Sequence, residues 1–153
     1  MANSSSAITK TAGLLMKSLS TRNKDIISRR FGLKTGRKET LESIGKSYSI
    51  TRERVRQIEE FSLNQLAKQV SGSPDIAKYV SLAKEILTGS GGVMKESEMF
   101  KAFSGNDKEN VVNASLVFVL ALAGEPVRFG ENDSFHSFWA ADKQNADLFK
   151  NSV

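Results

Sequence analysis

The chain contains no cysteine and only one histidine, His136, among its 153 residues. Disulfide bridges and thiolate zinc sites are therefore excluded, and the single histidine disfavours metal sites and catalytic triads built on histidine. No run of 18 or more apolar residues occurs, so we expect no transmembrane helix. The N-terminus lacks the basic and apolar regions of a secretory signal. These absences predict a cytoplasmic protein that holds no metal and does not bind a membrane.

Positive charge is concentrated in one half of the chain. Residues 1–70 contain 14 Lys and Arg against 6 Asp and Glu, a net charge of +8. Residues 71–153 contain 8 against 11, a net charge of −3, so the halves sum to the overall +5. A basic half is typical of a protein that binds a polyanion, although basic domains without a specific ligand share this signal.

Capping and turn residues divide the first half into three predicted helices. The first spans about Ser20 to Phe31, and Gly32 ends it. A short helix starts near Thr40, with apolar side chains at helical spacing, and Thr51 caps a longer helix. The tight turn at residues 48–50 separates these two. A short helix, a tight turn and a longer helix form the helix-turn-helix pattern.

Four polar side chains cluster at the N-terminal end of the longer helix, away from its apolar face. They are Arg52, Glu53, Arg56 and Gln57. A recognition helix enters the major groove by this end. Arginine donates two hydrogen bonds to guanine, glutamine pairs with adenine, and glutamate accepts from cytosine. These residue types favour base readout, but the same run is equally typical of a solvated helix face.

Residues 19–68 resemble region 4 of sigma-70-type transcription factors. Three runs carry the resemblance: Arg-Phe-Gly-Leu at 30–33, Thr-Leu-Glu-Ser-Ile-Gly at 40–45 and Ile-Thr-Arg-Glu-Arg-Val-Arg-Gln-Ile-Glu at 50–59. In that family, the module binds the major groove of the −35 promoter element and docks on the flap of the RNA polymerase beta subunit. The resemblance implies double-stranded DNA and RNA polymerase as partners.

The resemblance also implies a role for individual residues. The base-reading residues are Arg52, Glu53, Arg56 and Gln57. The DNA-backbone contacts are Arg22, Lys46, Thr51 and Arg54. The candidates for docking on polymerase are Phe31 and Phe61. Core packing is the alternative for Phe31. Phe61 stands where the family often has lysine, and its alternative is packing on the second half of the chain.

Several residues depart from the family pattern. Arg29 stands where the family has an apolar residue, and Thr21 and Asn23 replace acids. The chain also contains no counterpart of the aromatic-rich helical domain with which sigma factors capture the −10 strand. We therefore expect either a region-4-like regulator or a piece of a longer chain.

The second half follows a joint at residues 71–75, whose Ser, Gly and Pro residues disfavour helix. Three helices are predicted between residues 76 and 123, then strands at 126–129 and 134–140 joined by a turn at 130–133. This order resembles a HARE-type winged helix. The third helix is strongly apolar and nearly devoid of Lys and Arg, which favours contact with protein over contact with DNA. His136, Phe138 and Trp139 are interpreted as strand packing.

The predicted fold class is mostly α: a helix-turn-helix domain of three to four helices, then a winged-helix-like α+β domain with a β-hairpin. The predicted boundaries are a disordered segment at 1–14, the first domain at 15–71, the second at 75–142, and a tail or linker at 143–153. No nucleophile-base pair, carboxylate dyad, phosphate loop or metal cluster is present in the sequence, so we expect neither an enzyme nor a cofactor.

Two functions remain open. The first is a transcription regulator that reads a −35-like element together with RNA polymerase. The second is an interaction module that docks on RNA polymerase or a sigma factor without reading bases. A single helix-turn-helix binds DNA weakly alone, so the first function requires tethering to polymerase or a homodimer.

Overall fold

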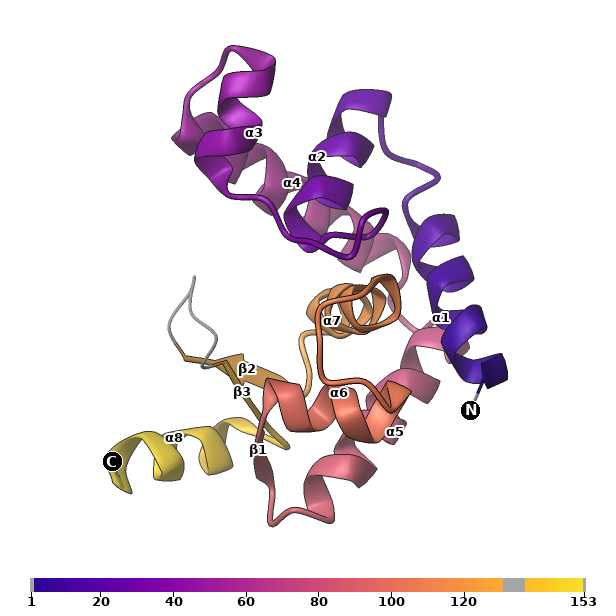
Figure 1. The fold of residues 1–153 in the computed structure, drawn as a ribbon, viewed down its shortest axis with the longest axis vertical. Helices are drawn as coiled ribbons and strands as arrows, with labels where there is room; N and C mark the ends of the chain where they lie inside the picture. Colours follow the sequence, from indigo (N-terminus) through magenta and orange to yellow (C-terminus); the bar gives the residue numbers. More distant parts are fainter. Residues whose placement is uncertain (1, 131–136, 153) are drawn as a thin grey trace.

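A computed structural model describes residues 2–130 and 137–152 of the chain. This part contains eight helices and three short strands, whose arrangement can be followed in Figure 1. In chain order they are α1 (Ala2–Leu15), α2 (Thr21–Phe31), α3 (Leu41–Tyr48), α4 (Arg52–Gln69), α5 (Pro74–Thr88), β1 (Val93–Lys95), α6 (Glu96–Ser104), α7 (Val111–Ala123), β2 (Val127–Phe129), β3 (Phe138–Ala140) and α8 (Lys143–Ser152). The predicted class, mostly helical with a helix-turn-helix followed by a winged-helix-like α+β half, is confirmed.

The helices of the helix-turn-helix begin at the predicted capping residues. The side chains of Ser20, Thr40 and Thr51 each accept a hydrogen bond from the backbone N–H three residues later. These bonds satisfy amides that the first turn of a helix leaves without a partner. Gly32 ends α2 in the left-handed conformation, with φ of 77°, as its position predicts. The local sequence therefore determines where these helices begin and where α2 ends.

The expectation that residues 1–14 are disordered is wrong. Residues 2–14 belong to α1, and Ile8 and Ala12 are 0% and 2% exposed. Ile8 joins the core of the second half, and Ala12 joins a cluster that includes residues of α7. The Ser- and Thr-rich composition suggested fraying, but burial of these apolar side chains stabilises the helix.

In its described part, the second half combines four helices, α5 to α8, with a three-stranded antiparallel sheet. The strand order is β1-β3-β2, so β3 is central, and Trp139 lies opposite Met94 on one side and Arg128 on the other. The two predicted strands are present as β2 and β3, and residues 134–136 of the second prediction lie outside the described residues. Strand β1 was not predicted, because Val93–Lys95 is too short for an alternating pattern. The element order is that of a winged helix.

Helix α7 lies at the centre of the molecule and joins the two halves (Figure 1). Its Leu116 and Val119 pack in the core of the second half. Its Phe118 and Leu122 pack in a cluster with residues of α1, α2 and α4, among them Ile27. A helix that is apolar on all sides must be covered on all sides. Helix α7 therefore contributes to two hydrophobic clusters and links the two halves.

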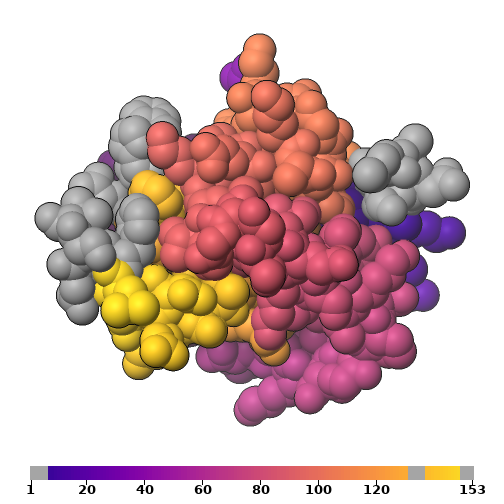
Figure 2. Space-filling view, turned by 90° about the horizontal axis from the view of Figure 1, so that it is seen from below, coloured from indigo at the N-terminus to yellow at the C-terminus, as the bar shows by residue number. Residues whose placement is uncertain are grey.

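The last described residues, which were expected to form a tail or linker, are instead helix α8. Ala146 of this helix is 1% exposed, and α8 contacts all three strands. Figure 2 shows the molecule from below, where the second half forms most of the surface. His136 and most of the predicted turn at 130–133 lie outside the described residues. Within the described part, no helix combines the length and apolar character needed to cross a membrane.

Candidate nucleic-acid interface

The turn between α3 and α4 brings the two helices into close backbone contact. A Cβ atom added at Gly45 would lie 2.7 Å from the carbonyl oxygen of Ile50, a separation that real Cβ atoms do not adopt. Ser49 ends α3 in the left-handed conformation, with φ of 56°. The Ile50 side chain packs against the apolar cluster formed with Ile44 and Val55. Glycine at 45 and an apolar residue at 50 therefore fix the angle between the helices.

The four base-reading candidates lie together and exposed on the first two turns of α4. Val55 and Ile58, which alternate with them in sequence, are buried at 0% and 3% exposure. Glu53 is the centre of the group. Its carboxylate accepts hydrogen bonds from Arg56 and interacts with the side chains of Arg52 and Gln57. The structure thus places all four on the polar face, as the sequence predicts.

Arg56 is held between two carboxylates along the surface of α4. Its guanidinium donates to Glu53 at 2.8 Å and to Glu60 at 2.8 Å. Hydrogen bonding to Arg56 lowers the pKa of Glu53, and the two carboxylates raise the pKa of Arg56. In the described part of the chain, Arg52 makes no ion pair or side-chain hydrogen bond of this kind. A base-edge contact by Arg56 therefore requires breaking existing bonds, whereas one by Arg52 does not.

The four DNA-backbone candidates are all exposed. The hydroxyl of Thr51 accepts from the backbone N–H of Arg54 at 3.1 Å, so Thr51 acts as a cap. Lys46 lies 3.8 Å from Glu42, a loose surface pair. Arg22, on α2, donates a hydrogen bond to the side-chain oxygen of Asn23 at 3.2 Å. Contact of these four residues with the DNA backbone remains a proposal.

A partly buried network of hydrogen bonds and ion pairs holds α2 against α3. The sequence did not predict this network. Arg29 donates to both carboxylate oxygens of Glu39, at 3.0 and 2.8 Å, and to the hydroxyl of Ser47 at 2.8 Å. Tyr48 donates to Asp25 at 2.5 Å, and Asp25 also lies 3.6 Å from Arg29. The Arg29 hydrogen bonds lower the pKa of Glu39, and the hydrogen bond to Asp25, together with burial, raises the pKa of Tyr48. The departure of Arg29 from the family pattern was the one signal of this network.

Arg30 makes a second set of contacts, to α4 and to the loop before α3. Its Nε donates to Glu59 at 3.3 Å, and its terminal nitrogen donates to the carbonyl oxygen of Glu39 at 2.9 Å. The Arg30 and Glu59 side chains are 24% and 17% exposed, so solvent screens this pair less than a fully exposed one. Together, Arg29 and Arg30 hold the helix-turn-helix in one geometry.

The two phenylalanines proposed for docking lie in different environments. Phe31 is half-buried, and its ring meets that of Phe118 edge to face, with centroids 5.3 Å apart. Phe61 is 63% exposed on α4. The expectation that Phe61 packs on the second half is therefore wrong. Core packing is observed for Phe31, and only Phe61 presents a large exposed ring.

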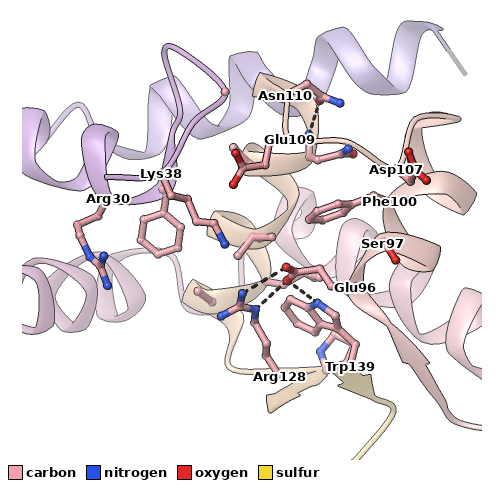
Figure 3. A pocket seen from close by; sticks show the side chains of 18 of the residues that line it. Arg30, Lys38, Glu96, Ser97, Phe100, Asp107, Glu109, Asn110, Arg128 and Trp139 are labelled. Carbon is pink, nitrogen blue, oxygen red and sulfur yellow. Dashed lines mark hydrogen bonds and ion pairs between the residues drawn. The ribbon is translucent and has the colours of Figure 1, made fainter. Parts of the chain in front are cut away.

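A cleft of about 820 Å³ lies between the two halves, and it was not predicted from the sequence. Figure 3 shows Arg30 and Lys38 from the first half facing Glu96, Arg128 and Trp139 from the second. The Glu96 carboxylate, only 12% exposed, accepts from Arg128 at 2.7 Å and from the indole N–H of Trp139 at 2.9 Å. This carboxylate thus links α6 to strands β2 and β3, and its hydrogen bonds are satisfied within the protein.

Comparison with known proteins identifies the class of the first half. Residues 15–68 match the family model described as sigma-70, region 4. This segment, about a third of the chain, is therefore similar to sigma-70 region 4, as the sequence motifs indicated. The match ends near the end of α4. The resemblance of residues 76–142 to a HARE-type winged helix stays a prediction.

Individual relatives match the same part of the chain. It is 48% identical over 52 residues to the RNA polymerase sigma factor SigA of Nostoc sp., which covers 34% of this chain and 13% of that protein. It is 44% identical over 66 residues to SigA of Clostridium acetobutylicum, covering 43% of this chain and 17% of that protein. The chain thus spans less than a fifth of the length of these relatives.

Proposed function

We propose that this chain is a transcription regulator that binds duplex DNA and reads a −35-like promoter element through α4, in association with RNA polymerase. The observation that carries the proposal is the exposed group of base-reading side chains at the N-terminal end of α4. That group stands on a capped and rigidly held helix-turn-helix. The relatives that match this segment are named RNA polymerase sigma factors, which supports polymerase as a partner.

Within the group, we assign the main base contact to Arg52. It is exposed, and it is not held by a carboxylate in the way that Arg56 is held by Glu53 and Glu60. A free guanidinium donates two parallel hydrogen bonds to guanine without first losing an ion pair. Gln57 is the second reader. Its side-chain oxygen accepts a hydrogen bond from Arg54 that is long, at 3.4 Å.

Fluorescence polarisation tests base reading directly. Wild-type protein and an Arg52→Ala/Gln57→Ala variant are titrated with a duplex that carries a −35 consensus and with a scrambled duplex, at two salt concentrations. We expect the wild type to prefer the consensus, and the variant to lose that preference while it keeps salt-dependent background binding. The matched control, Lys101→Ala/Gln144→Ala, removes the same charge from exposed positions of the second half and keeps the preference.

A second function is favoured by one observation. Phe61, on α4, is 63% exposed, and a large exposed aromatic side chain is typical of a protein contact. In this alternative the module docks on RNA polymerase or a sigma factor without reading bases. Equal binding of both duplexes by all three proteins, with polymerase core present, favours the alternative. Loss of polymerase binding in a Phe61→Ala variant then identifies the contact.

A further inference from the structure

A basic hollow of about 420 Å³ opens at the start of α2, and no residue of the recognition helix α4 lines it. Three lysines reach it from three separate segments. Lys17 follows α1, Lys24 lies in the first turn of α2, and Lys34 lies in the loop after α2. Convergence of three cations from different segments on one hollow results from the fold and is not visible as a run in the sequence.

The three lysines have no counter-charge of their own. In the part of the chain that the structure describes, none of their side chains takes part in an ion pair or hydrogen bond. Like charges that converge raise the local positive potential, and an anion relieves their repulsion. The hollow therefore presents an unneutralised positive potential.

One acidic residue lines the hollow, and its carboxylate is already engaged. Asp25 accepts a hydrogen bond from the Tyr48 hydroxyl at 2.5 Å and lies 3.6 Å from the Arg29 guanidinium through the same oxygen. It is therefore oriented by α3 and by Arg29, and it does not pair with any of the three lysines. The first turn of α2 contains no acidic residue, so the positive end of this helix adds to the potential.

We propose that Lys17, Lys24 and Lys34 form a binding site for a phosphate group. Lysine ammonium groups on flexible stems bind phosphate as point charges. Two sources supply this chemistry: a backbone phosphate of a bound DNA duplex, and free phosphate or a small phosphate ester. Only the first source rests on the proposed DNA-binding function. The site is separate from the base-reading side chains, so the two proposals fail independently.

Two triple variants test the site. The first is Lys17→Gln/Lys24→Gln/Lys34→Gln. The matched control is Lys68→Gln/Lys95→Gln/Lys101→Gln, which removes the same three charges from exposed positions that do not line the hollow. All of these side chains except the half-buried Lys24 are exposed, so both variants are expected to fold. Circular dichroism and thermal unfolding confirm the fold before binding is measured.

Inorganic phosphate alone is the first probe. Amide resonances of wild-type protein are recorded while phosphate replaces chloride at constant ionic strength. We expect saturating shifts confined to residues around the hollow, in the wild type and in the control variant, and no saturation in the first variant. Shifts spread over every basic segment would indicate general screening and count against the site.

A duplex of arbitrary sequence is the second probe, with Arg52 and Gln57 left intact. Its affinity is measured over a range of salt concentrations. Neutralising one phosphate contributes about 0.9 to the slope of log affinity against log salt. If the hollow holds a backbone phosphate, the slope for the first variant is expected to be smaller in magnitude than the slope for the control, by about 0.9. Equal slopes, combined with a positive phosphate titration, identify free phosphate or a small ester as the source. The proposal is overturned if the two variants behave alike with both probes.

Discussion

The rings of Phe31 and Phe118 meet edge to face across the boundary between the two halves, with centroids 5.3 Å apart and planes inclined at 68°. Phe31 is the last residue of the first helix of the region 4 match, and Phe118 lies at the middle of α7. Phe118 is completely buried among residues of α1, α2 and α4. The second half is thus part of the scaffold that holds the helix-turn-helix.

Truncation of Phe118 tests the shared core. We expect Phe118→Ala to lower the free energy of unfolding by about 3–5 kcal/mol, because it opens a cavity between the halves. Urea unfolding followed by far-UV circular dichroism reports all helices, and fluorescence of the single Trp139 reports the second half. The two curves are expected to coincide, as they do when a protein unfolds in one cooperative step.

The matched control is Phe61→Ala. It makes the same truncation at a phenylalanine that is 63% exposed. It is expected to change stability by no more than about 0.5 kcal/mol. Separate transitions for the two probes, or equal effects of the two truncations, would show that the halves fold independently.

The loop that follows α2 is pinned to the second half at Gly36. Its φ is +83°, and an added Cβ would lie 2.9 Å from the Cα of Asn110, the N-cap residue of α7. Gly36→Ala therefore combines backbone strain with a clash between two backbones. Gly72 has a φ of +82° and nothing within 4 Å of an added Cβ, so Gly72→Ala carries the strain alone.

We expect Gly72→Ala to destabilise by about 1–3 kcal/mol through strain, and Gly36→Ala to destabilise by more. Chemical unfolding of both variants measures the difference. If Gly36→Ala is the milder of the two, the loop does not rest on α7.

The Arg29–Glu39 pair is expected to make the protein less stable as the pH falls into the acid range. Its hydrogen bonds lower the pKa of Glu39 in the folded state below the value of about 4.3 for an unperturbed glutamate. The stabilising contribution is therefore complete above that value and is lost as the pH falls through the lower folded pKa. Melting temperatures measured from about pH 6 to about pH 3 follow this loss.

Replacement of Glu39 by glutamine is expected to flatten this acid limb relative to wild type, because the titrating group is gone. Glu42→Gln serves as the control, since Glu42 makes only a loose surface pair with Lys46. An acid limb in Glu39→Gln as steep as that of wild type would exclude Glu39 as its source.

Arg56 supplies a prediction about charge on the recognition helix. Glu60→Gln removes one of its two carboxylate partners and makes the net charge more positive by one on the side of α4 that is proposed to face DNA. We expect tighter binding to duplex DNA by about 2- to 5-fold, in proportion to the energy of an exposed ion pair. Polarisation titrations of wild type and variant measure the change.

Two further proteins separate release of Arg56 from the general change in charge. Glu42→Gln makes the same charge change on α3 and is expected to give a smaller gain. In an Arg56→Ala background, Glu60→Gln is expected to lose most of its effect. A gain that persists without Arg56 would contradict the proposed mechanism.

Local signals explain what the sequence predicts well. Ser20, Thr40 and Thr51 cap helices through bonds to amides three residues away, so the boundaries of α2, α3 and α4 are encoded within single turns. The apolar face of α4 follows from spacing, and this fixes which of its polar residues are exposed. The exposure of the four base-reading candidates was predicted for this reason.

Features that depend on contacts between distant segments were not predicted, because no local sequence signal encodes them. Helix α1 is stabilised by burial of Ile8 and Ala12 against other helices, which composition does not reveal. The bond from Arg29 to Glu39 requires the intervening loop to fold back, and the convergence of Lys17 with Lys34 requires α2 to be in place. Such arrangements arise only from tertiary packing.

A base-pair scan with Arg52→Ala tests the central claim, that α4 reads bases. Wild type and variant are titrated against duplexes that each differ from the preferred site by one base pair. We expect the wild type to lose about 1–3 kcal/mol at the contacted pair, and the variant to be insensitive at that one position. A variant that is weakened equally on every duplex, with its discrimination unchanged, would show that Arg52 contacts only the DNA backbone and would contradict the account.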